Sequence, residues 1–266
     1  MPPYFLLSQT LIDGAIGAPG SHSFTLSTAD GMKMVFHGNF TVAGGAITGG
    51  TVKGFDLFFG STKVMKAAGA SIDYAAVAAA ISDAQGGPGT QSFFELFASS
   101  AKLKGSSDDD YLQGVNSTKI LGKAGNDYLD AGMTSGKTKI DGGDSDDILV
   151  GNGLSKMKGG EGDDIFVFYD NLTTTADAIK DFDVKHDVIA LYPFVFDNTP
   201  VGYLDDAYFH VGKAAKTADH HVIYDKKTGA LYWDEDGSGA MAQVKLASLD
   251  KHLKMHADNI FVADFV

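Results

Sequence analysis

The chain has 266 residues, enough for one large domain or two to three small ones, and 44% of them are hydrophobic, which excludes a compositionally disordered chain. Its formal net charge of −13 disfavours nucleic acid and anionic membrane surfaces as partners and favours cations. The sequence has no cysteine, which excludes disulfides, thiolate metal sites and cysteine nucleophiles.

The first hundred residues predict a β-rich start to the chain. Residues 1–20 carry a short apolar run without Lys or Arg, which predicts a loosely structured N-terminal segment rather than a signal peptide. Residues 21–100 alternate apolar and polar positions between turn residues, which predicts a small domain built on an antiparallel β meander. Two short helices are expected in this domain, over 73–85 and 91–100. No run approaches the roughly 20 apolar residues of a membrane-spanning helix.

Residues 101–170 form a third region, in which one pattern occurs four times. Its copies align on Asp110, Asp127, Asp147 and Asp164. A large apolar residue follows each aspartate by two positions, at Leu112, Leu129, Leu149 and Phe166. Another precedes each aspartate by seven positions, at Leu103, Ile120, Ile140 and Met157. This spacing predicts a coil with two short strands per turn, in which the apolar residues point inward and stack on those of the neighbouring turns.

The aspartates of this pattern fall in glycine-rich loops on one edge of the predicted coil. Loops of successive turns lie one strand spacing apart, about 5 Å, so their carboxylates repel unless a hard cation lies between them. Carboxylate and carbonyl oxygens without His or Cys suit Ca²⁺. Loops on the opposite edge, at 115–119, 134–139 and 154–158, contain lysines and no aspartate, so calcium is expected on one edge only. Four stacked loops leave three gaps, which predicts up to three ions.

The stretches "GKAGNDYLD" (122–130) and "GGEGDDIFV" (159–167) resemble the glycine-rich nonapeptide of the RTX, or hemolysin-type calcium-binding, family. The resemblance implies a parallel β-roll with Ca²⁺ between successive loops, held by the sixth-position aspartate and by carbonyls of the first four positions. Only alternate half-turns are Gly/Asp loops here, and only the last copy is complete. Carried over by position, the implied metal ligands are Gly105, Ser107, Asp108, Asp110, Gly122, Ala124, Gly125, Asp127, Gly142, Gly143, Asp144, Asp147, Gly159, Gly160, Glu161, Gly162 and Asp164.

The region from 171 to 266 is predicted to be a β-rich C-terminal domain, because short apolar stretches alternate with turns. Residues 177–191 resemble the segment that closes the roll in RTX proteins, which implies that Asp181 and Asp187 hold one further ion. Residues 224–240 and the ending "ADFV" resemble the region that directs such proteins to type I secretion. The resemblance therefore implies an extracellular protein whose partners are calcium ions and the type I secretion machinery.

One further stretch, "DEDGSG" at 234–239, resembles the first half of an EF-hand loop. Asp234, Asp236 and Ser238 stand at its alternate positions. The twelfth position of such a loop is normally Glu, and here it is Lys245. The sequence therefore favours a plain hairpin turn over an ion site.

The function predicted from the sequence is that of a secreted, non-enzymatic protein that folds when it binds calcium. The sequence has no H-E-x-x-H, G-x-S-x-G or P-loop pattern that would indicate a catalytic site. One alternative is a calcium-dependent adhesion protein, in which residues 21–100 bind an extracellular surface or polysaccharide. Another is a small secreted hydrolase or epimerase, which would need a polar pocket in 21–100 or 171–266.

Overall fold

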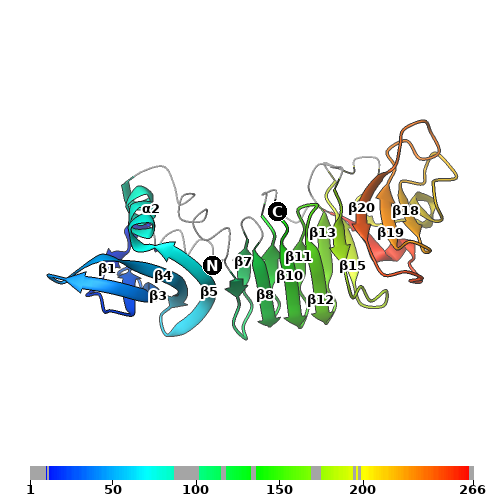
Figure 1. Ribbon diagram of the computed structural model, residues 1–266. Helices are drawn as coiled ribbons and strands as arrows, with labels where there is room; N and C mark the ends of the chain where they lie inside the picture. Colours follow the sequence, from blue (N-terminus) through cyan, green and yellow to red (C-terminus); the bar gives the residue numbers. More distant parts are fainter. Residues whose placement is uncertain are drawn as a thin grey trace. The chain divides into compact units, whose positions relative to one another are not determined.

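The computed structural model describes residues 10, 12–86, 102–114, 118–132, 136–168, 175–193, 196 and 199–263 (Figure 1). The chain divides into two compact units, Met1–Leu129 and Asp130–Val266, and each is described by itself. Strands dominate both units, and the first unit also contains the α-helix α2 (Tyr74–Gly86). The predicted mainly-β class with a parallel β-roll is confirmed. The boundaries of the predicted domains stay a prediction.

The first unit begins with an antiparallel meander, as predicted. Its strands, in consecutive pairing, are β1 (Ala15–Ile16), β2 (Ser23–Ser27), β3 (Met32–Ala43), β4 (Ala46–Phe59) and β5 (Thr62–Asp73). Alternate residues of β2 and β3 point into the core, where the rings of Phe24 and Phe36 stack with centroids 4.5 Å apart. The α2 helix follows β5 directly, and the Asp73 carboxylate accepts a hydrogen bond from the Ala75 backbone N–H. The second predicted helix, over 91–100, lies outside the described residues.

The β-roll begins in the first unit with two turns. On one side of the roll, β6 (Lys102–Lys104) and β8 (Lys119–Ala124) pair in parallel, with Leu103 opposite Ile120. The other strand of each turn is β7 (Tyr111–Gln113) or β9 (Tyr128–Asp130). The Tyr128 N–H donates to the Asp110 carbonyl at 2.8 Å, and the rings of Tyr111 and Tyr128 stack at 4.7 Å.

The second unit contains further turns of the roll in two parallel ladders. One ladder comprises β10 (Lys139–Asp144), β12 (Lys156–Glu161), β14 (Asp177–Ile179) and β20 (Val244–Ser248). The other comprises β11 (Ile148–Val150), β13 (Ile165–Phe168), β15 (Val188–Leu191) and β21 (Ile260–Val262). The fully buried inward residues are in register, with Ile140 opposite Met157 in the first ladder and Leu149, Phe166, Ile189 and Ile260 in line in the second. The predicted apolar frame thus forms the core of the roll.

The chain after the roll completes both ladders and adds a small β-layer. The strand β16 (Gly202–Tyr203) pairs antiparallel with β21, while β17 (Phe209–Val211), β18 (Val222–Asp225) and β19 (Ala230–Trp233) extend the sheet of β20. Two short 3-10 helices, Asp206–Tyr208 and Ala257–Asn259, connect these strands. Trp233 and Phe196 pack edge to face in the core of this layer. None of the described helices is both long and apolar enough to span a membrane.

Candidate metal centre

The aligned aspartates of the second unit form a buried ladder at one edge of the roll. Each lies directly before a strand of the second ladder, Asp147 before β11, Asp164 before β13 and Asp187 before β15. The Asp147 backbone N–H donates to Asp164 Oδ1 at 3.0 Å, and the Asp164 N–H donates to Asp187 Oδ1 at 3.1 Å. All three residues are buried. The structure therefore brings together, as a stack, residues that the sequence places 17 and 23 positions apart.

The first unit contains one step of the same ladder. The Asp110 backbone N–H donates to Asp127 Oδ1 at 2.8 Å, and both aspartates are buried. The contact from Asp110 to Asp127 is therefore the same as that from Asp147 to Asp164.

Glycine is required where these carboxylates approach the chain. A Cβ on Gly142 would lie 2.1 Å from Asp147 Oδ2, and one on Gly159 would lie 2.0 Å from Asp164 Oδ2. The second carboxylate oxygen of each aspartate therefore lies against the first glycine of its own repeat. Gly160 adds a positive φ of 121° and would meet the Gly143 carbonyl oxygen at 2.0 Å. These contacts explain why the repeat needs glycine at its start.

The loop backbones that the sequence assigns to calcium also lie turn against turn. Gly143 is opposite Gly160 and Asp144 is opposite Glu161 in the pairing of β10 with β12. Gly125 lies against Asp108, because a Cβ on this glycine would be 2.7 Å from the Asp108 carbonyl oxygen. The remaining loop positions that the sequence assigns to the site are Ser107 in the first loop, Gly122 and Ala124 in β8, and Gly162 directly after β12.

The electrostatics of the ladder favour a bound cation. Asp164 Oδ2 is buried and has no hydrogen-bond partner among the described residues. Burial, together with neighbouring carboxylates, raises the pKa of Asp164 to about 6 and that of Asp187 to about 7. Burial likewise raises the pKa of Asp127 to about 7. These carboxylates are costly to ionise unless positive charge is added, and their oxygen donors fit a hard cation such as Ca²⁺.

Side chains alone do not complete a metal site on this edge. Over the ranges that the structure describes, no group of three or more His, Asp or Glu side chains could hold an ion by itself. The stacked loops would therefore have to add backbone carbonyl oxygens, which Ca²⁺ accepts readily because it takes six to eight oxygen ligands.

Asp181 and Asp187 both lie at the closing turn, but they make different contacts. Asp187 continues the ladder above Asp164, whereas Asp181 Oδ1 accepts a hydrogen bond from the Gly159 N–H at 3.0 Å. The Lys158 ammonium lies 3.8 Å from Asp181 Oδ2, and burial raises the pKa of Asp181. A common ion for the two aspartates stays a prediction.

The first loop pair carries a positive charge of its own. Lys123, at φ 101°, stands in the second position of its repeat, where the family pattern has glycine. Its ammonium donates a hydrogen bond to the Gly105 carbonyl, which the sequence assigns to calcium. This charge also lowers the pKa of Asp110 and of Asp127, against the larger effect of burial.

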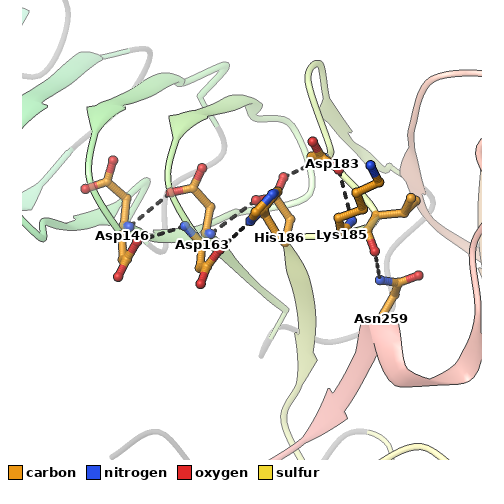
Figure 2. A network of polar contacts seen from close by, with 10 residues as sticks. Asp146, Asp163, Asp183, Lys185, His186 and Asn259 are labelled. Carbon is orange, nitrogen blue, oxygen red and sulfur yellow. Dashed lines mark hydrogen bonds and ion pairs between the residues drawn. The ribbon is translucent and has the colours of Figure 1, made fainter.

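A second, exposed ladder beside the first was not predicted. The Asp163 N–H donates to Asp146 Oδ1 at 2.8 Å, and Asp163 Oδ1 lies 2.8 Å from His186 Nδ1 (Figure 2). In the first unit, the Asn126 N–H donates in the same way to Asp109 Oδ1 at 2.7 Å. The sequence signal was the acidic or Asn residue directly before each aligned aspartate. His186 takes this place in the closing turn, before Asp187.

The opposite edge of the roll also contains an aspartate that sequence reasoning missed. Asp177, at the start of β14, is buried, and its Oδ1 accepts a hydrogen bond from the Ser155 N–H at 2.6 Å. Its other oxygen lies against Gly151, where a Cβ would be 2.0 Å away. Asp177 comes from the closing segment rather than from a repeat, so the repeat alignment gave no signal for it.

One protein family and two solved structures are similar to this chain. A family model described as "Peptidase M10 serralysin C terminal" matches residues 76–260. Among solved structures, the AlgE6R3 subunit of the Azotobacter vinelandii mannuronan C5-epimerase is 25% identical and matches 60% of this chain and 76% of its own, with a TM-score of 0.28. Extracellular lipase LipA from Serratia marcescens is 13% identical and matches 94% of this chain and 31% of its own, with a TM-score of 0.22. No curated protein matches the chain.

Proposed function

Because the chain belongs to the RTX family, as a Peptidase M10 serralysin C-terminal domain over residues 76–260, we propose that it is a secreted calcium-binding protein whose roll folds when calcium binds. The RTX β-rolls of this family generally bind Ca²⁺. The proposal adds which residues of this chain hold the ions and how binding is coupled to folding.

The observation that carries the proposal is the buried aspartate ladder of the second unit. Asp164 accepts a backbone hydrogen bond from one neighbouring turn and donates one to the next, so its carboxylate is held at the loop edge by the fold itself. Its second oxygen is buried without a hydrogen-bond partner among the described residues. A group of this kind destabilises a protein unless a ligand completes its coordination.

We assign the ions to the gaps between stacked loops. In the second unit, the carboxylates of Asp147, Asp164 and Asp187 and the carbonyls of the glycine-rich loops at 142–145 and 159–162 would hold them. When bound, Ca²⁺ supplies the positive charge and the oxygen coordination that these buried groups lack. The number of ions and a further site at Asp181 stay predictions.

Folding is coupled to binding through the shared residues of the ladder. Without an added cation, the ionised carboxylates repel across a strand spacing and the narrow core of each turn must offset this repulsion alone. With the ligands satisfied, binding free energy becomes folding free energy. Affinities of about 10⁻⁴–10⁻³ M, typical of extracellular calcium modules, would leave the chain unfolded in the cytosol and folded outside the cell. This behaviour suits export by the type I route, which we propose for this chain.

The proposed role is that of a binding and folding module rather than of a catalyst. The matched family is that of the C-terminal domain of serralysin, which is the non-catalytic RTX part of that enzyme. We therefore assign no catalytic residue in 76–260.

Calcium binding by the purified full-length chain tests the proposal. Isothermal titration calorimetry should show saturable Ca²⁺ binding that Asp164→Asn reduces by at least one ion, because Asp164 stands between Asp147 and Asp187. Asp163→Asn is the matched control, since it removes an equal charge from the exposed neighbouring side chain. Equal stoichiometry in the wild type and Asp164→Asn would reject the assignment.

A further inference from the structure

The turn between β19 and β20 contains acidic side chains that the roll does not use. It runs from Asp234 to Gln243 and begins with the sequence Asp-Glu-Asp-Gly-Ser-Gly. Asp234 follows the core residue Trp233 directly and is only 5% exposed, although it is an aspartate at the end of a strand. An acidic residue in a hairpin turn is normally solvated, so this burial requires an explanation.

Three side-chain oxygens of this turn are buried without a hydrogen-bond partner among the described residues. They are Asp234 Oδ1, Asp236 Oδ1 and Gln243 Oε1. The amide nitrogen of Gln243 donates to the Lys213 carbonyl at 3.0 Å, which fixes its amide group and leaves the oxygen as a buried acceptor. Three such acceptors within ten residues are unusual, because almost all buried polar groups in native proteins have partners.

The backbone holds the turn in this conformation. The Met241 N–H donates to Asp236 Oδ2 at 3.0 Å, and this oxygen lies so close to Gly239 that a Cβ there would be 2.0 Å away. Gly237 has a φ of 59° and packs against the Ala218 carbonyl oxygen, which a Cβ would meet at 2.3 Å. The Ser238 N–H donates to the Thr217 carbonyl at 2.9 Å. Asp236 is therefore placed by its second oxygen, while its first remains available.

The charge of His221 lowers the pKa of Asp234, but less than burial raises it. Neither Asp234 nor Asp236 has an ion pair within the described part of the chain. Burial and the neighbouring charge of Asp236 raise the pKa of Asp234. Asp56, the buried aspartate of the meander, provides a contrast. Lys63 and His37 lie 2.8 and 3.1 Å from its Oδ2, and they lower its pKa against the effect of burial.

We propose that the turn from Asp234 to Gln243 binds a hard divalent cation, Ca²⁺, through Asp234, Asp236 and the amide oxygen of Gln243. Asp234 and Asp236 stand two residues apart, as the first ligands of EF-hand loops do, and Gln243 replaces the missing glutamate of the twelfth position. Lys245 at that twelfth position is exposed on β20. With two carboxylates and no bidentate glutamate, the affinity belongs to the weak range of about 10⁻⁴–10⁻³ M.

This site uses none of the residues assigned to the roll, so the two assignments can fail separately. The cation would fix the turn on the loop at 213–221, which packs beside Trp233 through the ring of His221 at 5.3 Å. The His221 Nδ1 lies 2.7 Å from the Asp234 carbonyl oxygen, which places Asp234 at the junction of the core and the turn.

Trp233 provides a direct assay, since it is the only tryptophan of the chain. Tb³⁺ occupies oxygen-rich calcium sites, and tryptophan transfers excitation energy to it only at short range. Excitation at the red edge of the absorption band, where tyrosine does not absorb, should therefore give saturable terbium emission that Ca²⁺ displaces. Asp234→Asn and Asp236→Asn should each weaken Tb³⁺ binding by about tenfold or more, because each removes one charged ligand.

Matched variants separate this turn from the rest of the protein. Glu235→Gln removes an equal charge from the exposed residue between the two aspartates and should leave the emission unchanged. Asp164→Asn, which alters the roll, should also leave it unchanged. Near-UV circular dichroism checks that each variant is folded, and Gln243→Leu replaces any aspartate variant that is not. The inference is overturned if the wild type gives no emission, or if the Asp234 and Asp236 variants retain full affinity.

Discussion

Asp164→Asn should change the stability of the roll in opposite directions with and without calcium. Above pH 7 in chelator, Asp164 is ionised although burial raises its pKa to about 6, from 3.8 for an ordinary aspartate. This pKa difference means that the ionised carboxylate destabilises the folded state by at most about 3 kcal/mol. We expect a cost of about 1–2 kcal/mol, because the effective dielectric constant is about 20 even at buried sites. Asn removes this cost and can still accept the Asp147 hydrogen bond, so the metal-free variant should be the more stable protein.

With calcium the order should reverse. A site at tenfold excess of ion over its Kd stabilises the folded state by about 1.4 kcal/mol. Asp164 contacts both Asp147 and Asp187, so its loss affects two neighbouring gaps and should remove about 3 kcal/mol of calcium-dependent stability. The variant should therefore gain much less stability from calcium than the wild type does.

At about pH 8, thermal unfolding in millimolar Ca²⁺ measures the effect with calcium. In chelator, where the wild-type roll is largely unfolded, the folded-to-unfolded ratio of Asp164→Asn in far-UV circular dichroism should be about 5–30 times that of the wild type. Asp163→Asn controls for the loss of charge, because it breaks only the exposed pair with His186 and should stay within about 1 kcal/mol of the wild type. The reasoning is refuted if metal-free Asp164→Asn is less stable than the wild type, or if calcium stabilises both proteins equally.

Three further predictions follow from the ladder and its core. In chelator, the stability of the folded state should fall as pH rises from about 4 to about 7. The reason is that Asp127 and Asp187 have a pKa of about 7 when folded, so over this range they retain protons that the unfolded chain has lost. Thermal melts that show greater stability at high pH would contradict this. In millimolar Ca²⁺, Phe166→Ala should cost about 3–5 kcal/mol in urea unfolding. Ile165→Ala, in the same strand but half-buried, should cost clearly less. Lys123→Gly should add about one calcium ion in calorimetry by freeing the Gly105 carbonyl, and an unchanged stoichiometry would show that this lysine does not replace an ion.

The core of the roll could be predicted from the sequence because its spacing is local. Inward residues recur at fixed offsets from each aspartate, so the registers of Ile140 with Met157 and of Leu149 with Phe166 followed directly. The meander and α2 were predicted for the same reason, from alternation and from the Asp73 cap. The second predicted helix lies outside the described residues.

Features of the edges could not be predicted, because they depend on which turns become neighbours. The contact of Lys123 with Gly105 joins two loops whose facing atoms no linear pattern specifies. Asp177 reaches Ser155 from a segment outside the repeats. The sequence favoured a plain turn at Asp234, since the missing glutamate weakened the motif. The burial of its side-chain oxygen appeared only in the fold.

Far-UV circular dichroism of the metal-free, full-length protein during a Ca²⁺ titration tests the central claim most directly, with Mg²⁺ as the control. The account predicts a cooperative gain of β signal between about 0.1 and 10 mM Ca²⁺ and none with Mg²⁺, because the stacked oxygen ligands suit the larger ion. A protein whose β signal is already complete in chelator and does not respond to Ca²⁺ would contradict calcium-coupled folding of the roll.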